Sequence, residues 1–311
     1  MRIVFCGTPE FALPTLQRLL VEPDFSVETV LTQPDRPRGR GGEVTASPVK
    51  NVALDAGIHV FQPEKIKSDS AFEFFKRAAP DAVVIIAYGQ IVPARLLDIP
   101  RLGWINLHAS LLPKYRGAAP INWAIVNGET RTGLTTMRID PGMDTGPTLL
   151  SYETEILPDE TASHLSRRMA AAGPDLAIDT LRKYDRGEIA LAPQDHTRAT
   201  LAPMLKREDG RIDWSQSAPQ IYNRIRGLDP WPGAFTTFRG HVCHIWGRPE
   251  AKQETAAPGS LVVSEGNIFV SCGAGTSLRL EFVQLEGKKR VSARDWAHGA
   301  RLMADEKFAI H

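Results

Sequence analysis

Three polar side chains in two short segments are of the types that acyl transfer requires. Asn106 and His108 lie two positions apart in the run WINLHASLLP, and Asp144 lies in the Gly/Pro-rich segment PGMDTGP. An amide can donate a hydrogen bond to a developing oxyanion, an imidazole can carry a proton, and a carboxylate can orient or charge that imidazole. Each residue alone is also compatible with a structural role, but together they predict a catalytic site.

The elements that position these residues follow from the pattern of apolar runs. Short β-branched and aromatic runs such as SVETVLTQ, DAVVIIAYG and GWINLH alternate with helix-like segments around 48–57, 68–79 and 93–98. This alternation predicts a parallel α/β sheet with helices on both faces. Side chains repeat every second residue in a strand, so Asn106 and His108 share a face at its carboxyl end, where open sheets bind ligands. We expect Asp144 to converge with them on one cavity at this edge.

Other catalytic patterns are absent from the sequence. The segment GTPEFA at 7–12 follows the first strand, but it contains neither GxGxxG nor a Walker lysine, so no nucleotide fingerprint is present. Cys6, Cys243 and Cys272 are odd in number and widely spaced, which fits neither a disulfide framework nor a zinc site. We therefore predict no metal and reduced thiols.

Composition predicts a globular chain of two domains. The chain has 311 residues, of which 42% are apolar and 23% charged, and its net charge is only +1. Residues 187–206 lack a sustained period and contain two prolines, whereas 233–285 hold short alternating runs parted by Gly and Pro. We expect a catalytic domain at 1–189, a linker at 190–206 and a small antiparallel β domain at 207–311.

The location of the protein is also predicted from the sequence. No stretch approaches the ~20 consecutive apolar residues that a membrane-spanning helix needs. The first strand-like run begins almost at Met1, so we expect no signal peptide and a cytoplasmic protein.

A basic loop at 34–50 offers a second kind of function. It carries Arg36, Arg38 and Arg40 among glycines and prolines, between a strand and a helix. Such a segment is usually a flexible, solvated loop. Alternatively, it becomes ordered against the phosphates of a nucleic acid.

Four separated motifs give the chain a family resemblance. NLHASLLPKYRGAAPINWAI together with GMDTGP resembles the folate-dependent formyltransferases. QPDRPRGRG with SPVK, and IYNRIRGLDPWPGAF, are similar to the members that formylate charged tRNA, although Gly42 and Glu43 stand where those members carry two lysines. The resemblance implies a Rossmann-like formyltransferase domain and an OB-like β-barrel. It also implies 10-formyltetrahydrofolate as formyl donor and methionyl initiator tRNA as acceptor. We expect no obligatory protein partner, because none is evident in the sequence.

The resemblance implies roles for individual residues. Asn106 is the oxyanion donor, and His108 either donates to the same oxygen or carries the proton. Asp144 either fixes the tautomer of His108 and favours its imidazolium form, or relays the proton through water. Ser110, Leu111, Leu112 and Pro113 line the folate pocket, as do Tyr88 and Gly89, although a buried structural Tyr88 is equally compatible with the sequence. The residues expected to bind tRNA are Arg36, Arg38, Arg40, Lys206, Arg207, Arg224, Arg226, Lys288, Lys289 and Arg290.

Two other readings use part of the same pattern. A formyltransferase acting on a small amine, either a purine-pathway ribonucleotide or an amino sugar, would share the three polar residues. It would need neither the basic loop nor the second domain. A binding module that only holds folate or RNA would not need all three groups.

Overall fold

The computed structural model describes residues 1–38, 43–251, 256–303 and 305–309, with backbone alone for Arg38 and Glu43. Two compact units divide these residues. The first contains 1–120, 131–155 and 166–202, and the second contains 121–130, 156–165 and 203–311.

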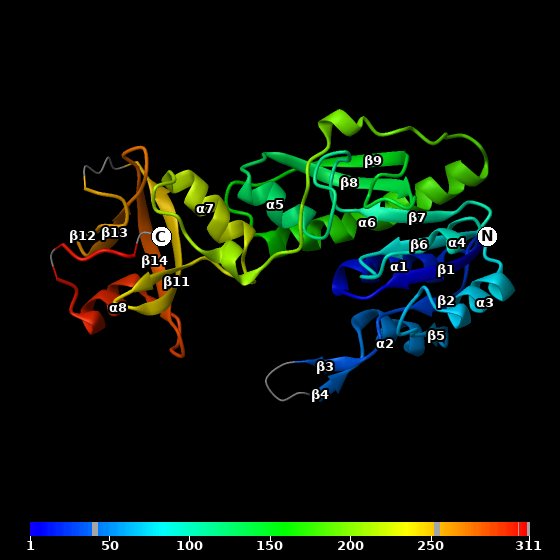
Figure 1. The fold of residues 1–311 in the computed structure, drawn as a ribbon, viewed down its shortest axis with the longest axis horizontal. Coiled ribbons are helices and arrows are strands. Elements are labelled where there is room, and N and C mark those ends of the chain that lie inside the picture. Colours follow the sequence, from blue (N-terminus) through cyan, green and yellow to red (C-terminus); the bar gives the residue numbers. More distant parts are fainter. Residues whose placement is uncertain (39–42, 252–255, 304, 310–311) are drawn as a thin grey trace. The chain divides into compact units, whose positions relative to one another are not determined.

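A seven-stranded sheet in the order β5-β2-β1-β6-β7-β8-β9 forms the centre of the first unit (Figure 1). Neighbouring strands are parallel from β5 to β7, while β7–β8 and β8–β9 are antiparallel pairs. The mostly parallel α/β fold predicted from the sequence is therefore confirmed, with an antiparallel hairpin added at one edge. The strands are β1 (Arg2–Gly7), β2 (Ser26–Leu31), β5 (His59–Phe61), β6 (Ala82–Ile86), β7 (Trp104–His108), β8 (Arg131–Arg138) and β9 (Thr148–Glu155), with β3 (Arg36–Arg38) and β4 (Glu43–Thr45) in a separate two-stranded sheet.

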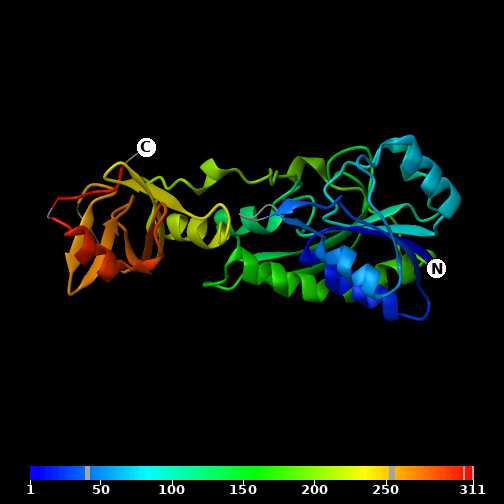
Figure 2. The same cartoon turned by 90° about the horizontal axis from the view of Figure 1, so that it is seen from below.

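Helices cover both faces of the large sheet. Figure 2 shows α3 on one side and α1 and α6 on the other. Ser47 and Ser68 begin α2 and α3 as N-caps, because their hydroxyls accept from the N–H groups of Lys50 and Ala71. Over both units, the helices are α1 (Leu13–Val21), α2 (Pro48–Asp55), α3 (Asp69–Ala78), α4 (Ala94–Leu97), α5 (Pro120–Val126), α6 (Ala162–Asp185), α7 (Ala218–Gly227) and α8 (Ala293–Ala300), and the 3-10 turns are η1 (Glu10–Ala12), η2 (His196–Arg198) and η3 (Arg207–Gly210); α7, α8 and η3 belong to the second unit.

Strand β7 is packed differently on its two faces. Trp104 joins a buried cluster with Phe75 of α3 and Leu96 of α4, and its indole N–H donates to the Leu96 carbonyl at 2.8 Å. Leu107 faces the opposite side, where a Cβ added to Gly173 of α6 would lie 2.8 Å from its side chain. This glycine lets α6 approach β7 closely. Packing on both faces therefore fixes the position of the strand that carries Asn106 and His108.

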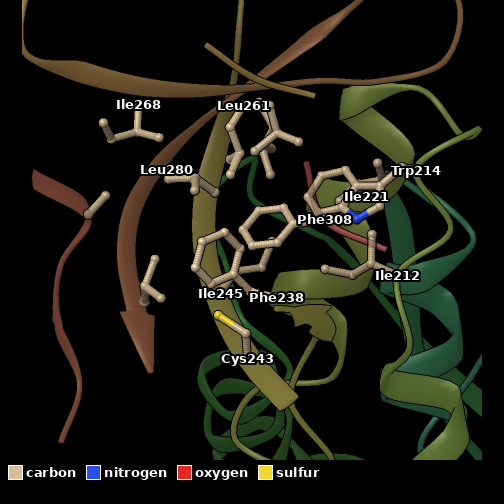
Figure 3. Close-up of a cluster of buried hydrophobic side chains, with 14 of the residues drawn as sticks. Ile212, Trp214, Ile221, Phe238, Cys243, Ile245, Leu261, Ile268, Leu280 and Phe308 are labelled. Carbon is tan, nitrogen blue, oxygen red and sulfur yellow. The ribbon is translucent and has the colours of Figure 1, made fainter. Parts of the chain in front are cut away.

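The second unit is built on an antiparallel sheet in the order β10-β11-β14-β13-β12, with β15 paired to β14. Its strands are β10 (Phe235–Phe238), β11 (His241–Glu250), β12 (Leu261–Ser264), β13 (Asn267–Ser271), β14 (Ser277–Leu285) and β15 (Val291–Ser292). Phe238, Ile245 and Phe308 meet in its buried core, with Trp214 stacked on Phe308 at 5.3 Å between ring centroids (Figure 3). The antiparallel β domain expected from the alternating runs is thus present.

Residues 190–202, which the sequence predicts as part of a linker, lie against the first unit. Ala192 exchanges backbone hydrogen bonds with Thr148, and Ala202 donates to the carbonyl of Arg116 at 2.7 Å. Because these hydrogen bonds join residues 190–202 to the first unit, the boundary between the units falls at Pro203.

Candidate active site

Asn106 and His108 lie at the carboxyl end of β7, on the face that Trp104 shares. Asn106 pairs in register with Ile85 of β6, and His108 with Thr135 of β8. His108 is only 6% exposed, whereas Asn106 is half-buried. The alternation of the run WINLH thus brings an amide and an imidazole to the same edge, as the sequence predicts.

Asp144 lies in the tight loop that joins β8 to β9. The Asp140 carboxylate accepts from Gly142 N–H at 3.0 Å and from the Thr145 hydroxyl at 2.6 Å, which closes the start of the loop. At Gly146 a Cβ would lie 1.9 Å from the Arg138 carbonyl oxygen, so glycine is required there. Asp144 itself has φ +52°, a conformation unusual for a residue with a side chain. The loop therefore fixes the backbone from which the Asp144 carboxylate projects.

The three side chains meet at one place. Asn106 Nδ2 donates to Asp144 Oδ1 at 3.4 Å, and His108 Nδ1 lies 3.6 Å from Asp144 Oδ2. The backbone N–H of Gly117 also donates to Asp144 Oδ2, at 2.8 Å. The three side chains therefore meet as the sequence predicts, and the cavity that they are expected to line stays a prediction.

The His108 tautomer is set by a carbonyl group. Nε2 of His108 lies 2.9 Å from the carbonyl oxygen of Tyr115, and a carbonyl can only accept. Nε2 must therefore carry a hydrogen, which leaves Nδ1 as the basic atom in the neutral ring. That atom faces Asp144. The Tyr115 carbonyl, and not Asp144, therefore sets the tautomer of the neutral ring, while Asp144 lies next to the basic nitrogen.

The Ser-Leu-Leu-Pro corner after β7 is built onto β8. The buried Ser110 hydroxyl donates to the Lys114 carbonyl at 2.6 Å, and its own carbonyl accepts from the Thr135 hydroxyl at 2.7 Å. The Thr135 hydroxyl also accepts from Leu112 N–H at 3.1 Å. Leu111, Leu112 and Pro113 remain partly exposed and follow Asn106 and His108 closely in the chain.

Tyr88 does not present its ring at the sheet edge. The ring is 2% exposed and packs in the cluster of Cys6 and Trp104, and its hydroxyl has no hydrogen-bond partner among the described residues. Burial raises the pKa of this phenol well above its usual value. A pterin cannot stack on a side chain enclosed in the core, so the expected ring contact is corrected to the structural alternative.

The edge near Tyr88 is polar through other groups. The Tyr88 carbonyl accepts from the Thr8 hydroxyl at 3.2 Å and from Gln33 Nε2 at 3.0 Å. Gln90 donates to Gln33 Oε1 at 3.4 Å, and Gly89 is exposed with φ +89°. Gln33 and Gln90 are not predicted from the sequence, although both lie just past the carboxyl end of a parallel strand, the same sheet edge at which His108 ends β7.

Comparison with known proteins assigns the chain to a family. The formyl transferase family model matches residues 1–181, and the model of the formyl transferase C-terminal domain matches 204–301. A methionyl-tRNA formyltransferase from Solibacter usitatus (strain Ellin6076) is 54% identical over 99% of this chain and 98% of its own length. One from Koribacter versatilis (strain Ellin345) is 50% identical, with the same coverage. The chain belongs to the methionyl-tRNA formyltransferase family.

Solved structures of formyltransferases share the fold. WlaRD, a sugar 3N-formyl transferase crystallised with dTDP and 5-N-formyl-THF, superposes with a TM-score of 0.67 at 17% identity, covering 93% of this chain and 99% of that one. HypX from Aquifex aeolicus in complex with tetrahydrofolic acid has a TM-score of 0.61 at 16% identity, covering 99% of this chain and 48% of that one. At these identities the similarity concerns the fold alone.

The basic loop of this family member is partly a hairpin. Strands β3 and β4 pair antiparallel, and Arg36 is exposed on β3. The loop base is held by an ion pair between Lys50 and Asp35, whose carboxylate also accepts from Gln62 Nε2 at 2.9 Å. The side chain of Arg38 and all of Arg40 lie outside the described residues.

The basic residues of the second unit divide into exposed and buried groups. Lys206, Arg207, Lys288 and Lys289 are exposed, and Arg207 lies 3.7 Å from Glu286, which brings η3 next to the turn after β14. Arg290 is exposed too, and its guanidinium stacks 4.0 Å from the Trp246 ring centroid.

Arg224 and Arg226 differ from these exposed residues. Arg224 is half-buried and donates to the Asp209 carbonyl. Arg226 is 8% exposed and donates to Asn223 and to the carbonyls of Leu157 and Glu160. Its guanidinium is used inside the unit, so the expectation that Arg226 contacts tRNA is corrected to a structural role.

No group of three or more His, Cys, Asp or Glu side chains suited to a metal ion occurs in the part of the chain that the structure describes. Over the same residues, no helix is both long enough and apolar enough to cross a bilayer.

Proposed function

We propose that the chain transfers the formyl group of 10-formyltetrahydrofolate to the α-amino group of methionine esterified to initiator tRNA. The observation that carries the proposal is the convergence of Asn106, His108 and Asp144 at one sheet edge. The Asp144 carboxylate lies 3.4 Å from Asn106 Nδ2 and 3.6 Å from His108 Nδ1. Membership of the methionyl-tRNA formyltransferase family, over nearly the full length of the chain, supports the choice of donor and acceptor.

The reaction begins with attack of the neutral amine on the formyl carbon. Free α-amino groups titrate near about 7.7–8.0, so a neutral fraction exists at cellular pH without a strong base. A C–N bond forms to the methionyl amine, and negative charge develops on the formyl oxygen. Asn106 Nδ2 has two hydrogens, and Asp144 takes only one of them. The other is available for the oxyanion.

Collapse of the tetrahedral intermediate requires a proton transfer. The amine nitrogen must lose a proton, and N10 of the folate must gain one as its bond to the formyl carbon breaks. The Tyr115 carbonyl engages His108 Nε2, so Nδ1 is the ring atom that can move this proton. Asp144 Oδ2, 3.6 Å away, stabilises the imidazolium formed during the transfer.

The remaining assignments follow from this reaction. We propose that residues 1–189, together with the segment 190–202 that packs on them, hold the chemistry, and that residues 207–311 form an OB-like domain that binds the body of the tRNA. Ser110, Leu111, Leu112, Pro113 and the backbone at Gly89 would line the folate site. The protein would work in the cytoplasm, where charged initiator tRNA meets the ribosome.

The test supplies purified protein with formyl-labelled 10-formyltetrahydrofolate and a panel of acceptors. Methionyl initiator tRNA, methionyl elongator tRNA, free methionine and an amino sugar nucleotide are compared. We expect N-formyl product on the methionyl initiator tRNA. Product on the amino sugar alone would instead support the small-amine reading, and folate binding without transfer would support the binding-module reading.

A further inference from the structure

Two buried side chains outside the proposed catalytic set connect to its loop. Arg116 and Gln194 are 6% and 7% exposed. Arg116 donates from Nε and Nη2 to Gln194 Oε1, at 3.1 and 2.7 Å. Gln194 Nε2 donates in turn to the carbonyl oxygens of Asp144 and Gly146, at 2.9 and 2.6 Å. The amide of Gln194 is therefore used on both ends, between a buried cation and the loop that carries Asp144.

The backbone on either side of Arg116 reaches the other site groups. The carbonyl of Tyr115 fixes the His108 ring, and the N–H of Gly117 binds the Asp144 carboxylate. Arg116 is held in place because its own N–H donates to the Thr200 carbonyl at 2.9 Å. One short segment thus contacts His108 and Asp144 directly and reaches the Asp144 backbone through Gln194.

The Asp144 loop needs such support. Asp144, at φ +52°, is in a sparsely populated backbone conformation that surrounding contacts stabilise. Gln194 binds the carbonyls on both sides of Thr145, in the half of the loop that contains Asp144. Without these bonds, the carboxylate would be free to leave its place beside His108 and Asn106.

We propose that Gln194, held by Arg116, is a positioning residue for formyl transfer. Gln194 keeps Asp144 in register with His108 and Asn106 without touching either substrate. This inference rests on the proposed function of the same site. It also gives residues 190–202 a part in the chemistry, because Gln194 belongs to the segment that the sequence predicts as linker.

The first test is Gln194→Met, which keeps the length of the side chain and removes its hydrogen bonds. Because small misplacements of a reacting group can cost about 10²-fold in rate, we expect kcat to fall roughly 10- to 100-fold. The KM for 10-formyltetrahydrofolate should change less than about threefold, since Gln194 does not touch the donor. The control is Ser68→Ala, which removes the N-cap of α3. It should lower thermal stability while leaving kcat at the wild-type value.

A double-mutant cycle separates positioning from general loosening of the fold. If Gln194 acts through Asp144, adding Gln194→Met to Asp144→Asn should lower kcat less than about twofold further, since coupled residues are not additive. Full multiplication of the two losses would overturn the proposal, as would wild-type kcat in Gln194→Met. If Gln194→Met does not fold, Arg116→Lys replaces it, with a smaller loss and the same non-additivity expected. Wild-type protein without transfer activity would instead refute the proposed function.

Discussion

Asn106 has two amide hydrogens, and among the described residues only Asp144 accepts one of them. The hydrogen bond to Asp144 orients the amide, so the direction of its second N–H is fixed before the substrate binds. We expect Asn106→Ala to lower kcat by about 10²–10³-fold, the usual effect of removing one oxyanion donor. Steady-state kinetics with charged tRNA measures it. An equal loss of affinity for the formyl donor would make Asn106 a binding residue instead.

Removing the Tyr88 hydroxyl is expected to stabilise the fold rather than to lower activity. Its hydroxyl is buried without a hydrogen-bond partner among the described residues, and such a group costs free energy in the folded state. Tyr88→Phe should therefore raise the free energy of unfolding by about 1 kcal/mol. Folate affinity should remain at the wild-type value, because the ring lies in the core. Urea denaturation and folate titration measure the two quantities, and a large loss of folate affinity would return Tyr88 to the pocket.

The sequence predicts the orientation of Asn106 better than that of Tyr88. Asn106 and His108 were placed correctly because a period of two fixes their common face. Every residue of β6 is buried, so the apolar pattern before Tyr88 has no polar side that would indicate where the ring points. Gln194 and Arg116 were not predicted as partners, because a contact between residues so far apart in the chain leaves no trace in local sequence.

At the scale of elements, the end of α6 is joined to the loop between α1 and β2 by charge. Arg182 donates to both carboxylate oxygens of Asp24, at 2.8 and 2.7 Å, and these bonds lower the pKa of Asp24 to about 2. An unfolded Asp titrates near about 3.9, so the pair stabilises the fold above that pH. The stabilisation is lost as pH falls through about 2.

We therefore expect Asp24→Asn to reduce the loss of stability between about pH 4 and about pH 2. Urea midpoints of the wild type and the variant, compared at both ends of this range, measure the difference. Asp24 is partly exposed, so ~1 M salt should shrink the difference through screening. Identical acid slopes at low salt would mean that the pair contributes nothing to stability.

The elements themselves were predicted unequally. Parallel strands and capped helices have local signals, and the antiparallel β domain was anticipated from its short alternating runs. The packing of residues 190–202 on the first unit was not, because a segment without periodicity reads as a linker even where its backbone hydrogen bonds are satisfied by distant residues.

At the scale of the whole molecule, a net charge of +1 cannot attract a polyanion uniformly. Any attraction to tRNA must therefore come from local clusters of charge. The second unit offers one such cluster in Lys288, Lys289 and Arg290. Arg207 lies near it, because its guanidinium is 3.7 Å from Glu286. The lysines are exposed, whereas Arg226 is committed to internal carbonyls. Burial thus separates cations that can reach a phosphate from those that hold the fold.

The charge of Lys288 and Lys289 can be removed without disturbing the core, because both side chains are exposed. Lys288→Gln combined with Lys289→Gln should raise the KM for charged tRNA and leave the KM for 10-formyltetrahydrofolate unchanged. If each lysine meets one phosphate, the slope of log KM against log salt should fall by nearly two units, a value calibrated on duplexes and approximate for folded tRNA. The matched control, Lys65→Gln with Lys67→Gln, removes the same charge from exposed positions of the first unit. Equal effects in the two double variants would assign tRNA binding to net charge, and unchanged kinetics in the first would remove this cluster from recognition.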